Sequence, residues 1–288
     1  MKKTMMILAL AFGVTTAYAQ DLTSKKGEPY LPEEGDWAIG FNADPFITYA
    51  GNLFNGGTNT SPGITDPMGN LVITGKMFKD ATTAYRVMLR IGMGSSTWNN
   101  FVMQDGQTDP NITVNDSWKN SGRNIVIGGG LEMRRGKTRL QGYYGGMLWI
   151  MMTGGGDEFT YGNAFSTTNT SPTVTLTWAP VTSGPAIGSS RVTSTTAGSG
   201  FGFGLRGFIG AEYFVLPKIS IGAEYGWGVG MMNTGEGETV TESWDFANNT
   251  IKTTTSKTAG SKMFGLDTDI NMNNAMMSNG SVNIIFHF

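Results

Sequence analysis

The chain has 288 residues, including 42 glycines, no cysteine and a single histidine. Its 20 Lys and Arg are balanced by 22 Asp and Glu, so it lacks the excess of positive charge with which proteins neutralise nucleic-acid phosphates. Without Cys there are no disulfides, thiolate metal sites or cysteine nucleophiles, and one His makes imidazole-ligated metals and Ser/His relays hard to assemble. We therefore expect no nucleic-acid partner, no cofactor or metal, and no enzymatic activity.

The N-terminus has the plan of a secretory signal peptide. Lys2 and Lys3 give a positive start, Met5–Val14 is apolar, and Ala17–Ala19 forms a small-residue cleavage site before Gln20. An N-terminal membrane anchor is the alternative, but the apolar stretch is far shorter than the roughly 20 residues that span a bilayer. We expect the mature chain to begin near Gln20.

The mature chain shows the pattern of strands rather than helices. No stretch approaches the about 18 apolar residues of a transmembrane helix, and abundant glycine destabilises helix interiors. Apolar residues instead alternate with glycine and charged residues at a period of two, most cleanly in Ile219–Met231 and Tyr85–Met93. In chain order, the predicted strands are Asp36–Leu53, Leu71–Phe78, Tyr85–Met93, Asn124–Arg134, Arg139–Met151, Phe203–Val215, Ile219–Met231 and a last strand that ends at Phe288.

The connections between these strands alternate between short and long. Lys79–Thr82, Arg135–Lys137 and Leu216–Lys218 are tight turns, whereas the other connections are much longer. Three short turns and four long loops, with both termini on the side of the turns, predict an all-β fold. The fold expected is an eight-stranded antiparallel up-and-down transmembrane β-barrel with short periplasmic turns and four long extracellular loops. Gly40, Pro45 and Gly51 interrupt the first segment and Asn271–Gly280 interrupts the last, so the limits of these two strands stay open.

The direction of polarity separates this fold from a soluble sandwich or lipocalin-like barrel, which also has alternating strands. The charged positions share a face with many glycines, and the interior of an eight-stranded barrel is only wide enough for side chains to fill it. We therefore expect the charged and glycine-rich face to point inward and the apolar face to meet lipid. Aromatic residues on the apolar face then line the two membrane interfaces: Trp37, Tyr85, Tyr144, Tyr213, Tyr225 and Trp227.

The last residues carry the most specific motif, because Val282, Ile284, Phe286 and Phe288 form an alternating apolar face that ends on a C-terminal aromatic. With this ending, the chain resembles small outer-membrane barrels of Gram-negative bacteria, of the OmpX-like or OmpA-transmembrane-domain kind, over nearly the whole mature chain. The resemblance implies that the terminal strand is the signal read by the outer-membrane assembly machinery. The segment Gly27–Trp37 and the long Asn/Thr/Gly loops are similar to barrels from the Bacteroidota.

The resemblance also implies a division of the chain and a set of partners. Residues 1–19 would be the signal peptide, 20–35 a periplasmic N-terminal segment and 36–288 the outer-membrane β-barrel domain. Outer-membrane lipid and lipopolysaccharide, the barrel assembly machinery and other outer-membrane proteins are the expected partners. No catalytic residues come with the resemblance.

The charged residues of the inward face form the candidate site. Charges in a narrow interior are costly unless they are paired, so we expect an ion-pair ladder across the lumen. Arg86 and Arg90 share a face at a spacing suited to holding a facing carboxylate, for which Glu132 and Glu224 are the candidates. The predicted ladder comprises Asp44, Lys76, Arg86, Arg90, Glu132, Arg134, Arg139, Arg206, Glu212 and Glu224.

Two functions of different classes remain. The preferred one is a non-enzymatic structural or surface-interaction protein, which acts through its loops or as part of an outer-membrane assembly. The alternative is a small passive, porin-like channel for ions or small solutes, with the ladder as its gate. The glycines of the inward face leave room for such a pore, whereas the large rings of that face fill it: Phe46, Tyr143, Trp149, Phe208 and Phe214.

The long loops carry whatever recognition exists. Thr153–Ser199 and Met232–Ser261 are rich in Ser and Thr and are expected to be solvated and mobile; an adhesin-like surface is the alternative. Asp116, Asp157 and Glu158 are candidate calcium ligands, although the loops lack an EF-hand pattern.

Overall fold

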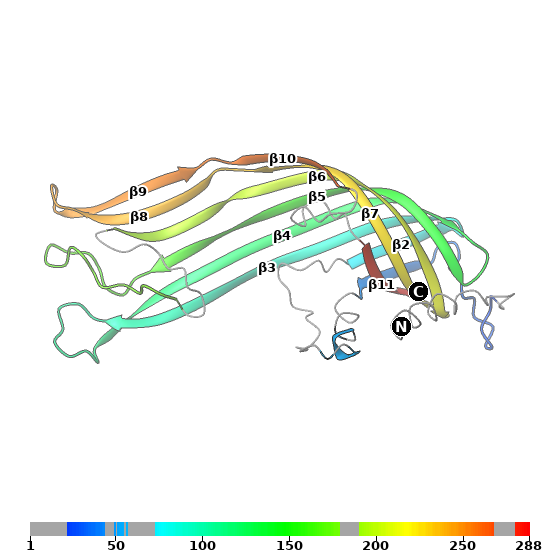
Figure 1. The fold of residues 1–288 in the computed structure, drawn as a ribbon, viewed down its shortest axis with the longest axis horizontal. Helices are drawn as coiled ribbons and strands as arrows, with labels where there is room; N and C mark the ends of the chain where they lie inside the picture. The colour runs from blue at the N-terminus through cyan, green and yellow to red at the C-terminus, as the bar shows by residue number, and fades with distance from the viewer. Residues whose placement is uncertain are drawn as a thin grey trace.

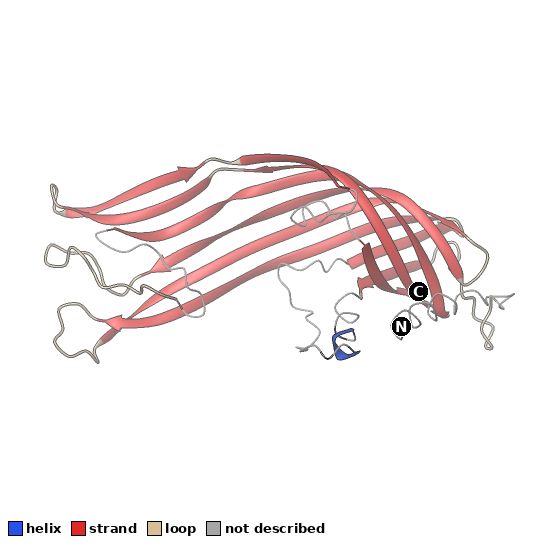
Figure 2. Ribbon diagram, viewed as in Figure 1, coloured by secondary structure: helices blue, strands red, loops and turns tan. Residues whose placement is uncertain are grey.

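The computed structural model describes residues 22–43, 49, 51–54, 56, 73–178, 190–267 and 280–288. The predicted signal peptide and Asp44 lie outside these residues. The described residues form an all-β protein in which eleven strands build one antiparallel sheet (Figures 1 and 2). In this part of the chain, no helix has the length and apolar character needed to cross a membrane.

Eight of the strands close into a ring by their pairing, in the order β1-β2-β3-β4-β5-β6-β7-β11 and back to β1. The strands are β1 (Trp37–Asn42), β2 (Ile73–Asp80), β3 (Thr83–Met103), β4 (Thr113–Arg135), β5 (Leu140–Thr160), β6 (Ser190–Leu216), β7 (Ile219–Thr234), β8 (Gly237–Asp245), β9 (Thr250–Thr258), β10 (Ser261–Asp267) and β11 (Gly280–His287).

The remaining three strands lengthen the sheet beyond the ring. β8 follows β7 along the edge of β6, and β9 pairs with β8. β10 and β11 lie one after the other along the same edge of β7, β10 opposite Gly228–Thr234 and β11 opposite Ile219–Tyr225. Most of the predicted interruption Asn271–Gly280 falls between them, in residues outside the described part of the chain.

Two ends of the molecule can therefore be distinguished. The turn end carries the three tight connections β2–β3, β4–β5 and β6–β7, at the places predicted from the sequence, together with the C-terminus. At the other end, the extension, β3, β4, β5 and β6 run for 21, 23, 21 and 27 residues, well past the short β1, β2 and β11 (Figure 1).

The extension corrects the prediction of mobile loops. Thr153–Ser199 and Met232–Ser261 contain the ends of β5, β6 and β7 and all of β8 and β9. The regular apolar alternation stops at the end of the ring, but the ladder of backbone hydrogen bonds continues into the extension, where many Thr residues favour strands. The first predicted strand was too long: β1 ends at Asn42, and residues 51–54 are helical.

The two faces of the ring are the reverse of those in a water-soluble protein. On β3, Tyr85, Val87 and Ile91 are 46%, 52% and 61% exposed. Arg86 and Arg90, between them on the opposite face, are 6% and 8% exposed. The same alternation runs through β4, β5, β6 and β7. The apolar face therefore points outward and the charged face inward.

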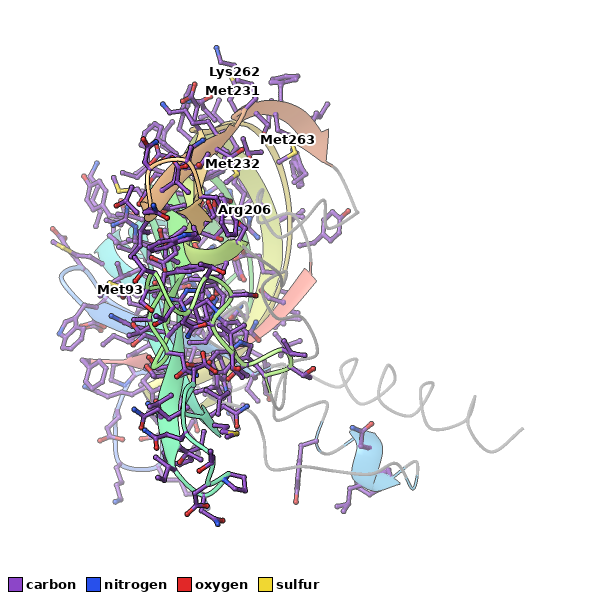
Figure 3. The ribbon with its side chains drawn as sticks, turned by 90° about the vertical axis from the view of Figure 1, so that its left-hand side faces the viewer. Met93, Arg206, Met231, Met232, Lys262 and Met263 are labelled. Carbon is purple, nitrogen blue, oxygen red and sulfur yellow. The ribbon has the colours of Figure 1, made fainter. Side chains whose placement is uncertain are left out.

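Large side chains fill the interior, and glycines of neighbouring strands make room for them. A Cβ on Gly204 or Gly230 would lie 2.6 or 2.7 Å from Trp149 Cζ2, so the indole occupies the space of both missing side chains. Tyr143 lies over Gly210 in the same way, and Phe208 over Gly145. The glycines of the inward face therefore make room for aromatic side chains and do not leave an open channel. Met232 and Met263 pack against this core on the side of the extension (Figure 3).

Candidate functional site

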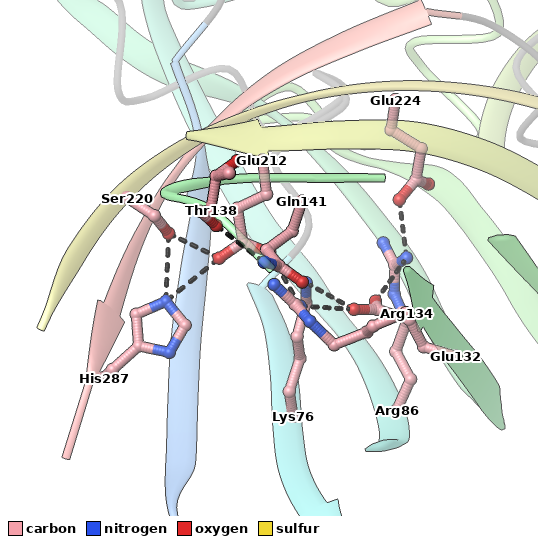
Figure 4. Close-up of polar contacts among 10 residues, drawn as sticks. All are labelled: Lys76, Arg86, Glu132, Arg134, Thr138, Gln141, Glu212, Ser220, Glu224 and His287. Carbon is pink, nitrogen blue, oxygen red and sulfur yellow. Dashed lines mark hydrogen bonds and ion pairs between the residues drawn. The ribbon is translucent and has the colours of Figure 1, made fainter. Parts of the chain in front are cut away.

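A network of charged side chains lies inside the ring (Figure 4). Each of its members is placed by the inward face of a strand, and the side chains are no more than 7% exposed. Within the described residues, the ion-paired members are Lys76 of β2, Arg86 of β3, Glu132 and Arg134 of β4, Arg206 and Glu212 of β6, and Glu224 of β7.

The half of the network nearer the turn end consists of two carboxylates that share two cations. Lys76 Nζ lies 3.0 Å from Glu132 Oε1 and 3.1 Å from Glu212 Oε2. Arg134 Nη1 lies 2.8 Å from Glu132 Oε1 and 2.9 Å from Glu212 Oε2. Each charge therefore has two opposite charges as neighbours, which offsets the cost of removing it from water.

The other half centres on Glu224. Its carboxylate receives Arg86 Nη1 at 2.5 Å on one oxygen and Arg206 Nη1 at 2.7 Å on the other. Arg86 Nη1 also lies 3.5 Å from Glu132 Oε2, so Arg86 joins the two halves. The sequence predicts that Arg86 and Arg90 hold one facing carboxylate, Glu132 or Glu224; in the structure, Arg86 contacts both, with Glu224 at the shorter distance.

The ion pairs cross the interior from wall to wall. Lys76–Glu212 links β2 to β6, and Arg86–Glu224 links β3 to β7; each pair joins strands four positions apart in a ring of eight, on opposite sides. Aromatic rings pack against the cations: Arg86 lies over Phe208 at 4.3 Å, and Lys76 over Tyr143 at 4.7 Å. The charged side chains and these aromatic side chains together fill the interior at this level of the sheet.

At the turn end, Glu212 also contacts Ser220 and His287. Ser220 Oγ donates to Glu212 Oε1 at 2.5 Å, and His287 Nε2 lies 3.0 Å from the same oxygen and 2.9 Å from Ser220 Oγ. A Ser/His/acid relay uses both ring nitrogens, one toward the hydroxyl and one toward the carboxylate. Here Nε2 faces both groups, and Nδ1 has no hydrogen-bond partner among the described residues. The three side chains therefore form a hydrogen-bonded cluster in which His287 does not lie between the hydroxyl and the carboxylate as it would in a relay.

The remaining predicted members of the ladder have different positions. Arg90 is buried on the face of β3 that carries Arg86, nearer the extension. Arg139 was placed in the ladder wrongly: it precedes β5 at the turn, only half-buried, and its guanidinium donates to the carbonyls of Phe214 and Val215. These carbonyls lie at a register shift at the end of β6, which leaves them available to a side chain.

The predicted terminal signal forms the outward face of β11. Phe286 and Phe288 are exposed, whereas Ile285, before them, and His287, between them, are buried. Phe288 stacks on Trp37 with ring centroids 4.3 Å apart, and Phe286 meets Phe41 at 6.4 Å. The first and last strands of the ring are thus joined by aromatic contacts as well as by the backbone hydrogen bonds between β1 and β11.

At the extension, residues 161–178 form an ordered segment, here called the cap, that folds onto the inward face of the sheet. Asp116 of β4 anchors it: one oxygen accepts from Gly162 N at 2.8 Å, the other from Thr175 N and Oγ1 at 2.8 and 2.9 Å. Asp116 is fully buried and serves the cap instead of calcium. Among the described residues, no group of His, Cys, Asp and Glu is arranged to hold a metal.

Two further anchors hold the cap. Asp105 Oδ2 accepts from Asn169 Nδ2 at 2.7 Å and from Thr173 N at 2.8 Å. Burial alone would raise the pKa of Asp105, but the hydrogen bonds from Thr173 and Asn169 outweigh it and lower that pKa. Arg191 donates to Asn163 O and to Glu242, each at 2.6 Å, and lies between the rings of Tyr161 and Phe165.

Aromatic residues gather beneath the cap. Trp98 of β3 and Trp118 of β4 have ring centroids 4.5 Å apart, and Phe159 of β5 and Trp178 of the cap lie 5.9 and 6.1 Å from Trp118. Sequence reasoning missed this cluster because its members come from three strands and a loop. The only signal available was the density of aromatic and Asp residues in segments otherwise rich in Ser and Thr.

The chain matches no protein-family model, and no curated protein matches it. Among solved structures, it is similar to the crystal structure of a major outer membrane protein from Thermus thermophilus, with a TM-score of 0.33 and 9% sequence identity over 89% of this chain and 100% of that one. At this TM-score the likeness establishes neither fold nor function for this chain.

Proposed function

We propose that this chain is a non-enzymatic integral outer-membrane protein, an eight-stranded up-and-down β-barrel with a closed, ion-paired lumen. The turn end faces the periplasm, and the extension faces the outside. The barrel displays the extension for surface contacts, alone or within a larger outer-membrane assembly. The signal-peptide plan of the N-terminus supports export to this location.

The inverted polarity of the ring carries this proposal. Outward residues of β3 are apolar from Tyr85 to Met93 and then change to Ser95 and Thr97. This apolar span is close to the roughly 9–11 residues that a tilted strand needs to cross a bilayer. A ring with exposed aliphatic and aromatic residues outside and paired charges inside is stable only where hydrocarbon covers its outer wall.

A closed lumen is favoured over the porin-like alternative by two features. Ion pairs join opposite walls at Lys76–Glu212 and Arg86–Glu224, and Trp149 fills the space left by two glycines. A water-filled pore would need the charges along the walls with solvent between them.

The test is refolding of the mature chain into lipid vesicles, followed by gel migration with and without heating and by single-channel recording. We expect a heat-modifiable, membrane-inserted protein with no stable conductance. Arg86→Ala serves as the comparison, because it removes the side chain that joins both halves of the network. Failure to insert would refute the barrel; stable openings of the inserted wild-type protein would favour the channel.

A further inference from the structure

The inward face of the extension carries three consecutive rows of cross-strand neighbours on β3, β4 and β5. Nearest the ring is a row of glycines, Gly94–Gly122–Gly155. Next comes a polar row, Ser96–Asn120–Asp157. The third row is aromatic, Trp98–Trp118–Phe159, and the cap covers its far side.

Two of the three glycines in this row, Gly94 and Gly122, leave open space beside the sheet, whereas Gly155 lies close to the backbone of Ser121. A Cβ built on Gly94 or Gly122 would have no atom within 4 Å, unlike the glycines of the ring, whose places are taken by Trp149, Tyr143 and Phe208. Along the strands, the polar row and then the aromatic row follow these glycines in the direction away from the ring.

The polar row is fixed in position by its own hydrogen bonds. Asp157 Oδ1 accepts from Trp118 Nε1 and from Asn120 Nδ2, both at 2.8 Å. Within the described residues, Asp157 Oδ2 has no hydrogen-bond partner. The carboxylate is therefore held by one oxygen and offers the other, beside an exposed amide, to a ligand.

The aromatic row supplies a flat apolar surface next to these acceptors. Trp98 stands at the edge of the cluster, partly exposed, and Trp118 behind it fixes the orientation of its ring. Rigid aromatic faces give contact area at a low entropic cost. The combination of one flat ring, one carboxylate oxygen and one amide fits a ligand whose body has both C–H faces and adjacent hydroxyl groups.

We propose that this face is a binding site for neutral saccharides, with Trp98 stacking on a sugar ring and Asp157 and Asn120 receiving and donating hydrogen bonds to its hydroxyls. Charge argues for a neutral ligand: the three rows carry Asp157 as their ionisable side chain, and the nearby Arg191 is paired with Glu242 and enclosed by the cap. The site deepens the proposed function, since it depends on the extension lying outside the membrane.

The test uses the refolded mature protein in a zwitterionic detergent, because detergents with sugar head groups would compete. Neutral and sialylated oligosaccharides on a glycan array, followed by titration monitored by Trp emission, provide the probes. We expect neutral glycans to bind in preference to sialylated ones. Trp98→Ala should weaken binding at least about fivefold, and Asp157→Asn, which keeps an oxygen for Trp118 but replaces the open acceptor by a donor, by roughly tenfold or more.

Phe101→Ala is the matched control, because it removes an exposed aromatic ring from the outward face of the same strand and should leave binding unchanged. If Trp98→Ala does not refold, Asp157→Asn and Asn120→Ala still test the site. An inserted, heat-modifiable wild-type protein that binds no neutral glycan would overturn this inference alone, as would binding that survives in all site variants. A protein that never inserts would instead refute the proposed function.

Discussion

Replacement of Glu212 by Gln tests the physical basis of the closed interior. Glu212 is fully buried and faces Lys76 at 3.1 Å, Arg134 at 2.9 Å, His287 at 3.0 Å and Ser220 at 2.5 Å. Gln has nearly the same shape and can still accept from Ser220, but it leaves two buried cations to share Glu132. Removal of one partner from a buried ion pair costs about 3–5 kcal/mol, because the other charge stays desolvated.

The assay is urea unfolding of the protein in lipid vesicles, followed by Trp emission and by the heat-modifiable band. Lys257–Glu236 provides the matched control: its charged atoms are also 3.1 Å apart, but its side chains are 61% and 62% exposed. Glu236→Gln should leave the unfolding midpoint unchanged. Equal small shifts for Glu212→Gln and Glu236→Gln would refute the reasoning, since burial would then have no bearing on the cost.

Three other predictions follow from packing, pH and the C-terminus. Gly230→Val should destabilise the folded protein by about 1–3 kcal/mol, because the new side chain meets an indole already in its place; Gly75→Val, where no atom lies within 4 Å of the added Cβ, should be tolerated, and equal stabilities would count against the packing argument. The lowered pKa of Asp105 means that its bonds to the cap are intact above its ordinary value of 3.8 and are lost as the pH falls through the lower folded value. Cleavage of the cap by pepsin should therefore rise at the acid end, and the rise should be smaller for Asp105→Asn than for the wild type measured at the same pH, whereas Asp109→Asn, which does not touch the cap, should behave like the wild type. Phe288→Ala should reduce assembly in cells more than refolding in vitro if the C-terminal Phe side chain is an assembly signal. Equal losses in the two assays would show that only its stacking on Trp37 matters.

The strands of the ring were predictable from sequence because each has one apolar face and one face of charged residues and glycines. In Tyr85–Met93 and Ile219–Met231, this alternation indicates both the strand conformation and which residues share a face. Because a buried charge is costly unless it is paired, the sequence also predicted that Arg86 and Glu224 take part in ion pairs. Which carboxylate lies nearer depended on the curvature of the ring, which no local pattern encodes.

The extension and the cap could not be predicted, because their residues lack this regular alternation. β9 is exposed on both faces, so its Thr-rich sequence, Thr250–Thr258, resembles that of a loop. The role of Asp116 depends on a cross-strand register that brings residues 162 and 175 onto it, far along the chain. Arg139 was misplaced for a related reason: one residue before a strand begins, the alternation no longer says where a side chain points.

The seam of the ring has a consequence for how the protein is made. β1 and β11, of 6 and 8 residues, are among the shortest strands, and they pair residues from nearly opposite ends of the chain, such as Ala38 with His287. Such long-range pairing is slow, because the intervening chain must be ordered before the contact forms. The hairpins from β2 to β7 can form one after another as an open, curved sheet, and the ring closes only when β11 pairs with both β7 and β1. A chain that lacks β11 would thus keep an exposed apolar surface and two strand edges with unpaired backbone groups. Both features favour aggregation.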